Sequence, residues 1–414
     1  MFRYTELKKT DEKVMSAIVG EMKRQEEGLE MIASENYASR AVIETLGTVF
    51  TNKYSEGYPG RRYYGGQEFT DSIEMLAIDR AKKLFGAEHA NVQPLSGASA
   101  NMSAYAATLQ PGDTVLGMDL SHGGHLTHGH PVTFTSKIFR FVRYKTEPDG
   151  SIDYRKLEAL AKVEKPKLLL AGFSSYTRQI DYEKFVAVGK KVGAITMMDM
   201  AHIAGLVAGG VVPNPVEHFD IVTTTTHKTL RGPRGGMILC REKFAKAIDK
   251  AVFPGVQGGP HMNIIAAKAV AFQEASKAGF RKYAAHVLRN AKVLSLEFER
   301  RGYTILFGGT ENHMLLLDVW GTLGVSGRDA EALLDAIGIT INKNVIPDEP
   351  RSPMDPSGIR IGVPAITTRG MKEREVKKIA EWMDRALRSG GDRVILRELR
   401  KEVCILCKKF PLYR

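Results

Sequence analysis

The sequence predicts an α/β protein with an N-terminal arm, a large domain built on a mostly parallel sheet, and a smaller α+β domain. Between about residues 71 and 280, helical segments alternate with short β-branched runs, which is typical of parallel strands joined by helices. The 414 residues exceed what one hydrophobic core supports. We therefore expect two domains: residues 1–280, which hold the arm and the large domain, and residues 281–414.

The elements follow in order along the chain. The arm begins with a helical pattern over 12–32 and ends in a Gly/Tyr-rich loop, KYSEGYPGRRYYGG. The strands expected in the large domain are DTVLGMD, KIFRFVRY, KLLLAGFS, AITMMDMA, DIVTTTTHK and GGMILC. A long helical segment over 264–302 leads to the small domain, where MLLLDVW and SGIRIG are expected to be strands between amphipathic helices.

Composition excludes several classes of function. The net charge of +12 suggests an anionic partner, but Lys and Arg alternate with Asp and Glu along most of the chain. The aromatic residues gather in the arm loop and not in the basic C-terminal tail, so nucleic acid is not an expected partner. No stretch reaches the ~18 apolar residues of a membrane helix, and the start lacks a secretory signal, so we expect a cytoplasmic protein without a membrane partner.

The three cysteines cannot form a disulfide framework. Cys404 and Cys407 form a single C-x-x-C pair without a second pair or a nearby histidine. We expect two cysteines on a helix face, because zinc and redox sites usually need further ligands or a different context.

Two polar residues follow apolar strands at the edge where open parallel sheets bind ligands. Lys228 comes directly after DIVTTTTH, where partial burial suits a lysine that forms a Schiff base. Asp199 ends an apolar strand and needs a cationic partner, since an unpaired buried carboxylate is costly. The protonated ring nitrogen of pyridoxal 5'-phosphate is such a partner. A structural pair with an arginine is the alternative.

Two further segments suit the same kind of cofactor. NVQPLSGASANMSAY reads as a turn of small residues that opens a helix, so Ser96, Gly97 and Ala98 are the expected phosphate cradle. HGGHLTHGH holds four histidines at mixed spacings without Cys or a carboxylate. This pattern favours one imidazole stacked on an aromatic ring over a metal site, and we expect no metal.

With these residues assembled, the sequence closely resembles serine hydroxymethyltransferase, a family of fold-type-I, aspartate aminotransferase-like enzymes that use pyridoxal 5'-phosphate. The matching segments run in the family's order from about residue 31 to 370: IASENYAS, TNKYSEGYPGRRYYGG, NVQPLSGASANM, LSHGGHLTHG, MDMAHIAGL, TTTTHKTLRGPRGG, FPGVQGGPH, INKNVIP and SGIRIGVPAITTRG. The resemblance implies reversible conversion of serine and a tetrahydropterin into glycine and the 5,10-methylene-pterin.

The resemblance also implies roles for individual residues. Lys228 would carry the cofactor as a Schiff base, Asp199 would pair with its ring nitrogen, and His125 would stack on its ring. The other implied cofactor contacts are Ser96, Gly97, Ala98, Ser174, His202, His227, Tyr54 and Gly259. The implied substrate contacts are Ser34, Glu56, Tyr63, Tyr64, Leu120, Gly124, Leu126, Asn344 and Arg360, of which Arg360 and Ser34 would hold the substrate carboxylate. Glu56 is the expected acid/base group, with Tyr64 and Thr225 also catalytic.

The arm loop of this family reaches into the neighbouring subunit, which implies an obligate homodimer or a tetramer of dimers. Leu95 and Ser99 depart from the residues common in bacterial members. Together with the basic tail and few amide side chains, these departures leave tetrahydrofolate and tetrahydromethanopterin both open as the carrier. A pterin-independent aldolase for β-hydroxy amino acids is the rival enzyme, although the arm motif and INKNVIP favour the pterin enzyme. Retro-aldol cleavage and direct displacement by the pterin nitrogen also remain open.

Overall fold

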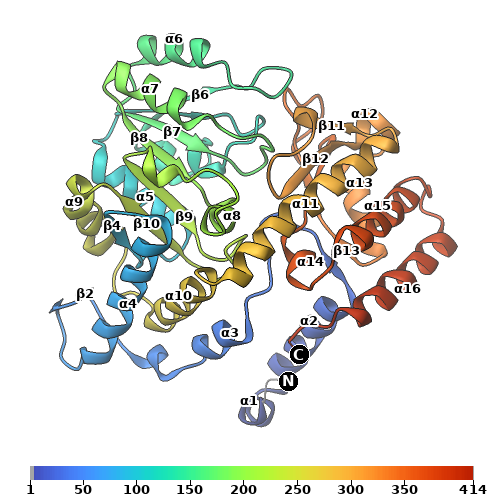
Figure 1. Cartoon of the computed structure of the whole chain (residues 1–414), viewed down its shortest axis with the longest axis horizontal. Coiled ribbons are helices and arrows are strands. Elements are labelled where there is room, and N and C mark those ends of the chain that lie inside the picture. Colours follow the sequence, from blue (N-terminus) through green and yellow to red (C-terminus); the bar gives the residue numbers. More distant parts are fainter. Residues whose placement is uncertain (1–3, 414) are drawn as a thin grey trace. The chain divides into compact units, whose positions relative to one another are not determined.

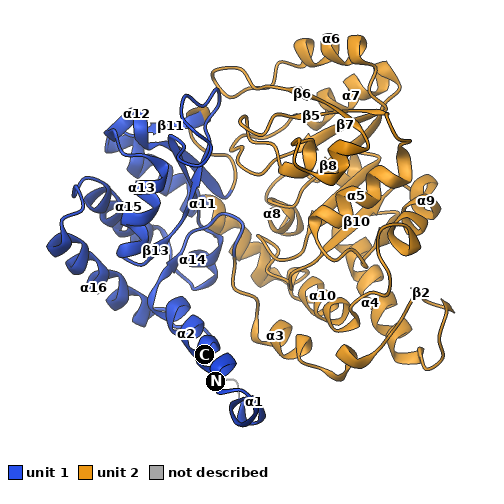
Figure 2. Ribbon diagram, turned by 180° about the vertical axis from the view of Figure 1, so that it is seen from behind, with its two compact units in different colours: residues 1–35, 289–306, 313–414 blue, residues 36–288, 307–312 orange. Residues whose placement is uncertain are grey.

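The computed structural model describes residues 4–413 (Figure 1), and the chain divides into two compact units (Figure 2). Unit 2 comprises residues 36–288 and 307–312, and unit 1 comprises the other described residues. Residues 4–35, which were grouped with the large domain on sequence, belong to unit 1 by their contacts. Helix α11 (Ala278–Arg300) runs from one unit into the other, so the change of unit at 288 lies close to the expected boundary at 280.

Unit 2 is built on a seven-stranded sheet in the order β4-β10-β9-β8-β7-β5-β6. Its strands are β4 (His89–Asn91), β5 (Thr114–Met118), β6 (Arg140–Tyr144), β7 (Leu168–Gly172), β8 (Ile195–Asp199), β9 (Ile221–Thr225) and β10 (Gly236–Cys240). Strands β5 to β9 are parallel, and β10 is antiparallel to both β9 and β4. All six predicted strands and the mostly parallel sheet are confirmed.

The strands of this sheet are apolar on both faces because both faces are covered. Leu168, Leu170, Met197 and Ile221 pack in one core with Ala100, Ala104 and Tyr105 of α5 (Gly97–Thr108). Helices α6 (Tyr154–Glu164) and α7 (Tyr182–Val192) contact β6 and β7 respectively. The remaining elements of unit 2 are β2 (Gly57–Tyr58), β3 (Arg61–Arg62), α3 (Arg40–Leu46), α4 (Glu68–Phe85), α8 (Ala204–Ala208), α9 (Ala245–Lys250) and α10 (Met262–Ala275).

The prediction of a single helical segment over 264–302 is wrong, because this part of the chain forms two helices, α10 and α11. Helix α10 ends at Ala275 with Ser276 as its C-cap, and the Ser276 hydroxyl donates to the carbonyl of Gln273. Lys277 N–H donates to Glu274, which closes a turn before α11 begins. The break arises from a serine that hydrogen-bonds to the backbone, a signal that the apolar periodicity of the segment obscures.

Unit 1 holds a four-stranded antiparallel sheet in the order β11-β12-β15-β14. Its strands are β11 (Thr304–Ile305), β12 (Met314–Asp318), β14 (Asn342–Asn344) and β15 (Gly358–Gly362), and β1 (Leu29–Glu30) pairs separately with β13 (Ile339–Thr340). The predicted strands MLLLDVW and SGIRIG are β12 and β15. The helices are α1 (Thr5–Thr10), α2 (Glu12–Glu27), α12 (Val319–Leu323), α13 (Gly327–Ala336), α14 (Pro364–Thr368), α15 (Glu373–Leu387) and α16 (Arg393–Lys409).

Cys404 and Cys407 both lie on α16, as expected, and Cys240 ends β10. All three are free thiols. Within residues 4–413, none of the helices is both long enough and apolar enough to span a membrane.

Candidate active site

Three neighbouring strands of the unit 2 sheet lead to polar residues at one edge. Asp199 is the last residue of β8, Ser174 follows β7 by two residues, and Lys228 follows β9 by three. These strands are parallel, with Asp199 opposite Gly172 on one side and Thr223 on the other, so their carboxyl ends share an edge. A Cβ at Gly172 would lie 2.4 Å from the backbone oxygen of Asp199, so only glycine allows this close approach.

Asp199 is buried and bound by three donors. Its Oδ2 accepts hydrogen bonds from Asn101 Nδ2 at 2.9 Å and His128 Nε2 at 3.2 Å, and its Oδ1 accepts from the N–H of Ala201 at 3.0 Å. Asn101 is itself fixed, because its Oδ1 accepts from the Thr223 hydroxyl at 2.6 Å. The carboxylate is therefore held in one orientation before any ligand binds.

These donors keep Asp199 ionised. Burial opposes ionisation, but the hydrogen bond from His128, the positive potential of His128 and His125, and the bond from Asn101 together outweigh it. The pKa of Asp199 therefore lies well below its usual range. An ionised carboxylate in this position can hold a proton on a cationic ring nitrogen.

The histidine turn after β5 completes the network. His128 Nδ1 accepts from the N–H of His125 at 3.2 Å, so the ring proton sits on Nε2 and points to Asp199. His125 Nδ1 accepts from the N–H of Thr127 at 3.2 Å. His125, His128 and Asp199 place ligand atoms within 4.8 Å of one another. Both ring nitrogens of His128 are engaged in hydrogen bonds within this group.

The same turn carries three residues expected to contact substrate. The carbonyl of Gly123 accepts from the N–H of Ser174 at 2.7 Å, which joins the turn to the end of β7. Leu120 closes the turn by accepting from the N–H of Gly123. A Cβ at Gly124 would lie 2.3 Å from a backbone oxygen of β5, so this position requires glycine. Leu126 follows at the start of a 3₁₀ turn and is substantially exposed.

The N-terminus of α5 presents backbone N–H groups, as the sequence predicted. Ser96 is the N-cap: its Oγ accepts from the N–H of Ser99 at 3.1 Å, and the Ser99 Oγ accepts from the N–H of Ser96 at 3.0 Å. The N–H groups of Gly97 and Ala98, in the first turn, have no intrahelical acceptor and suit an anion. A Cβ at Gly97 would lie 2.7 Å from Cγ2 of Thr225, so the turn must carry glycine where it meets β9.

The segment after β9 is buried and carries an orphaned polar atom. Lys228 is only 9% exposed, and its backbone carbonyl accepts from Asn36 Nδ2 at 3.0 Å. Burial, with the charges of Arg234 and Lys228, lowers the pKa of His227 to about 3, and its Nδ1 is buried without a hydrogen-bond partner. His202, three residues beyond Asp199, is also buried. The unpaired ring nitrogen of His227 could form a hydrogen bond with a polar ligand bound at this position.

The arm loop gathers four of the predicted residues. The Tyr64 hydroxyl donates to Glu56 Oε2 at 3.3 Å, and the Tyr54 and Tyr64 rings meet edge to face at 5.5 Å. A Cβ at Gly259 would lie 3.3 Å from Cε1 of Tyr54 and 3.5 Å from Cγ of Glu56. Tyr54, Tyr63 and Tyr64 are 60%, 71% and 50% exposed. Glu56 and Tyr63 line a cavity of about 520 Å³ with residues 253–258.

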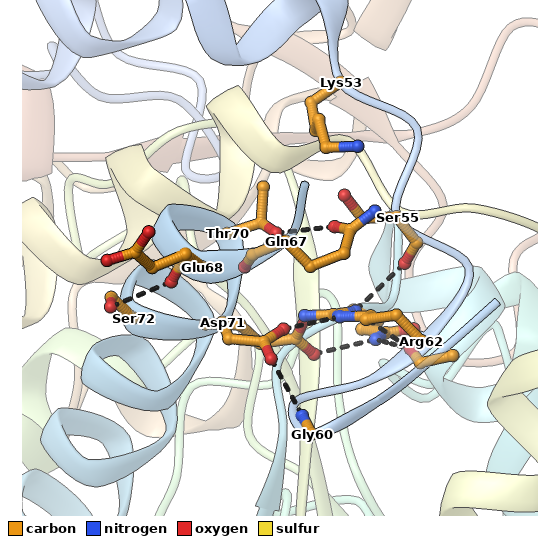
Figure 3. A network of polar contacts seen from close by, with 12 residues as sticks. Lys53, Ser55, Gly60, Arg62, Gln67, Glu68, Thr70, Asp71 and Ser72 are labelled. Atoms are coloured by element: carbon orange, nitrogen blue, oxygen red, sulfur yellow. Dashed lines mark hydrogen bonds and ion pairs between the residues drawn. The ribbon is translucent and has the colours of Figure 1, made fainter. Parts of the chain in front are cut away.

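A buried guanidinium fixes the backbone on both sides of Glu56 (Figure 3). Arg62 Nη1 donates to the carbonyls of Ser55 at 2.9 Å and Gly57 at 3.0 Å. Its Nε and Nη2 bind the carboxylates of Asp71 at 2.8 Å and Glu74 at 2.6 Å on α4. Arg62 was not among the site residues expected from the sequence, although it lies inside the arm motif. The network gives the arm loop a defined shape within one chain.

In unit 1, Arg360 is central to the predicted carboxylate site. It lies on β15, is buried, and donates from Nε to Asn342 Oδ1 at 3.0 Å, directly opposite on β14. Burial lowers the pKa of Arg360 to about 10, which still leaves the guanidinium charged at neutral pH. A Cβ at Gly362 would lie 2.4 Å from Cα of Ala33, so the segment holding Ser34 packs on the end of this strand.

Sequence reasoning missed the residues that hold these groups. His128 and Asn101 fix Asp199, and Asn342 fixes Arg360. Asn344, which was predicted, lies two residues further along β14, and its amide donates to the carbonyl of Val345 at 2.7 Å. The alternation of β14 puts Asn342 and Asn344 on the same face, which is the signal that could have included Asn342.

Comparison with known proteins agrees with this geometry. The sequence model of the family "Serine hydroxymethyltransferase" matches residues 7–383. A serine hydroxymethyltransferase of Acidobacterium capsulatum is 56% identical over 408 residues, covering 98% of this chain and 95% of the relative. Another, of Koribacter versatilis, is 55% identical over 408 residues, covering 98% and 96%. The chain therefore belongs to the serine hydroxymethyltransferase family, and it interconverts serine and glycine with a tetrahydropterin as carrier and pyridoxal 5'-phosphate as cofactor.

Proposed function

We propose that unit 2 binds pyridoxal 5'-phosphate through Lys228, Asp199 and the N-terminus of α5, and that serine is cleaved to glycine there. The observation that carries this assignment is the buried, ionised Asp199, which His128 and Asn101 hold at the strand edge shared with Lys228. Among residues 4–413, the salt-bridge partner of this carboxylate is a histidine, which suits a ligand that brings its own positive charge.

The residues present fit this cofactor. The first-turn N–H groups of α5 suit its phosphate, Asp199 suits its ring nitrogen, and Lys228 suits its aldehyde. The orphaned Nδ1 of His227 is a polar atom for a polar ligand to satisfy. Ser174 and His202 are proposed to contact the 3'-oxygen of the cofactor, and His125 to stack on its ring.

When bound, pyridoxal 5'-phosphate supplies an electron sink that stabilises negative charge at the Cα of an amino acid. Asp199 keeps a proton on the ring nitrogen, and His128 and Asn101 keep Asp199 in place and ionised. The amine of Lys228 would hold the cofactor aldehyde, and it could take or return a proton at the Cα of the substrate. Thr225, which packs on Gly97, holds the end of β9 against the cradle.

Arg360 is proposed to bind the carboxylate of serine or glycine with two parallel hydrogen bonds, assisted by Ser34. The bond from Arg360 Nε to Asn342 fixes the guanidinium plane. A carboxylate held by two bonds would leave the bound amino acid little freedom to rotate. Leu120, Gly124, Leu126 and Asn344 are proposed to contact the substrates.

Glu56 is proposed as the group that moves a proton to or from the hydroxymethyl oxygen of serine. The Tyr64 hydroxyl donates to Glu56 Oε2, and Arg62 holds the loop on either side. Replacing Glu56 with Gln should therefore lower serine cleavage with pterin by about 10²–10³-fold, because the amide cannot transfer a proton. Cofactor absorbance and glycine binding should be unchanged. Glu68→Gln is the matched control, because Glu68 is an exposed carboxylate in the first turn of α4 in the same unit.

We propose that the chain works as an obligate homodimer with arm loops exchanged between subunits. Tyr54, Tyr63 and Tyr64 are exposed large aromatic side chains gathered on one loop, which supports a protein interface. Tyr54 and Gly259 lie together in one chain, so both can reach the phosphate of a neighbouring subunit. We also propose that the protein works in the cytoplasm, because its three free thiols suit a reducing compartment.

Mixed dimers test the exchange directly. Glu56→Gln and Lys228→Ala subunits are each expected to be inactive as homodimers, but their heterodimers should regain activity because one site receives both native groups. The measurement is serine cleavage by heterodimers purified with two different affinity tags. Heterodimers no more active than either parent would show that each site is built from one chain.

We propose tetrahydrofolate as the pterin. Ser99 belongs to the capping box of Ser96, so its side chain has a local structural role. The Ser99 departure is therefore explained without a modified pterin. The expected result is a kcat/KM for serine cleavage at least about tenfold higher with tetrahydrofolate than with tetrahydromethanopterin, or ~1.4 kcal/mol in transition-state binding. An equal or reversed preference would contradict this choice.

A further inference from the structure

Lys268 on α10 is a fully buried lysine that the proposed function does not use. Only 1% of the surface of Lys268 is exposed to solvent. Its Nζ donates to three backbone carbonyls, those of Val92 at 2.6 Å, Gly236 at 2.7 Å and Pro94 at 3.0 Å. An ammonium has three N–H donors, whereas a neutral amine has two and a lone pair. Three acceptors around one nitrogen therefore favour the charged form.

These three carbonyls belong to two backbone segments that meet beside the start of α5. Val92 and Pro94 lie in the loop between β4 and the N-cap Ser96. Gly236 opens β10, its N–H donates to the Pro94 carbonyl at 2.9 Å, and a Cβ there would lie 2.3 Å from the carbonyl oxygen of Ser96. The ammonium thus joins the two strands of backbone that support the first turn of α5.

The charge of Lys268 has an electrostatic consequence for the same turn. Burial lowers the pKa of Lys268 to about 7, and the nearby Glu74 carboxylate opposes this fall. The ammonium hydrogen-bonds to carbonyls and, among the described residues, to no carboxylate. A buried positive charge beside the N-terminus of a helix adds to the positive potential of that end, and this potential favours a doubly charged anion.

We propose that Lys268 is a positioning residue for the cofactor phosphate. It holds the loop over 92–96 in the shape that presents the N–H groups of Gly97 and Ala98, and its charge strengthens the binding of a phosphate dianion. This role rests on the proposed assignment of Ser96, Gly97 and Ala98 as the phosphate cradle. It predicts that loss of Lys268 weakens binding of the phosphate and leaves binding of the pyridine ring unchanged.

The test compares two probes, pyridoxal 5'-phosphate and pyridoxal, which lacks the phosphate. Full-length native enzyme and Lys268→Met are freed of cofactor and titrated with each probe by absorbance. The variant should bind pyridoxal 5'-phosphate about tenfold more weakly, because bonds to charged groups are lost, and should bind pyridoxal with nearly native affinity. Equal losses for both probes, or no loss for either, would overturn the proposal.

Gly235→Ala provides an independent variant in case Lys268→Met does not fold. A Cβ at Gly235 would lie 2.6 Å from Cε of Lys268 and 3.1 Å from its Nζ, so it displaces the ammonium without removing its charge. Like Lys268→Met, Gly235→Ala should reduce the preference of the enzyme for pyridoxal 5'-phosphate over pyridoxal. Arg80→Met is the matched control, because Arg80 also donates to a backbone carbonyl of α10, that of Ala269 at 2.7 Å. Its preference should equal that of the native enzyme.

Gly97→Ala separates this proposal from the one on which it rests. The added Cβ would press on Thr225 and distort the cradle itself. If Gly97→Ala keeps the native preference for the phosphorylated probe, the cradle assignment is wrong and the role of Lys268 falls with it. If Gly97→Ala loses the preference while Lys268→Met and Gly235→Ala keep it, only the role of Lys268 is overturned.

Discussion

Purified Lys228→Ala should contain no covalently bound cofactor and should cleave serine more than about 10⁴-fold more slowly than the native enzyme. Lys228 follows β9 in a buried segment, at the same edge of the sheet as the ionised Asp199, which is proposed to pair with the ring nitrogen of the cofactor. Removing its amine removes both the attachment to the cofactor and the group that exchanges with the substrate amine. The measurements are the visible absorbance of the protein and the rate of serine cleavage with pterin.

The matched control for this variant is Lys190→Ala, because Lys190 is an exposed lysine of the same unit at the end of α7. It should keep native absorbance and native rate. Turnover of serine by Lys228→Ala at near the native rate would show that another lysine carries the cofactor.

Arg360→Ala should lower kcat/KM for serine by about 10³-fold, equivalent to ~4 kcal/mol, and should leave the cofactor attached. The guanidinium is buried on β15, so its removal would leave the substrate carboxylate without its charged partner. Arg360→Lys should recover little, because a lysine cannot form two parallel bonds to a carboxylate. Steady-state kinetics and cofactor absorbance measure the two effects separately.

Arg328→Ala is the control for this prediction, since Arg328 is an exposed arginine of the same unit. Loss of bound cofactor from Arg360→Ala, with the affinity for serine preserved, would contradict the proposed role of Arg360.

The strand-end residues were predictable from local pattern. Lys228 and Asp199 each follow an apolar run, and parallel strands bring such ends to one edge regardless of side-chain detail. The capping of α5 by Ser96 was also visible, because a small polar residue before a run of small residues is a local signal. Helix α15 is one of the amphipathic helices expected in the small domain, and its apolar face, which includes Val376 and Ile379, is buried as that periodicity requires.

The supporting contacts were not predictable because they join residues far apart in the chain. Asn101 and His128 meet Asp199 from a helix and a turn, at separations of 98 and 71 residues. The segment over 4–35 is joined to unit 1 by contacts that include the pairing of Leu29 with Ile339, which no local pattern encodes. Ser99 looked like a departure linked to the pterin, whereas its contacts are those of a helix cap.

The most direct test of the central claim is to identify the lysine that carries the cofactor. Borohydride reduces the bond between pyridoxal 5'-phosphate and its lysine and makes it permanent, and peptide mass spectrometry then locates the modified residue. We predict that the pyridoxyl group is found on Lys228, in the peptide that follows β9, and that Lys268 is unmodified. A pyridoxyl group on another lysine, or none on Lys228, would contradict the account.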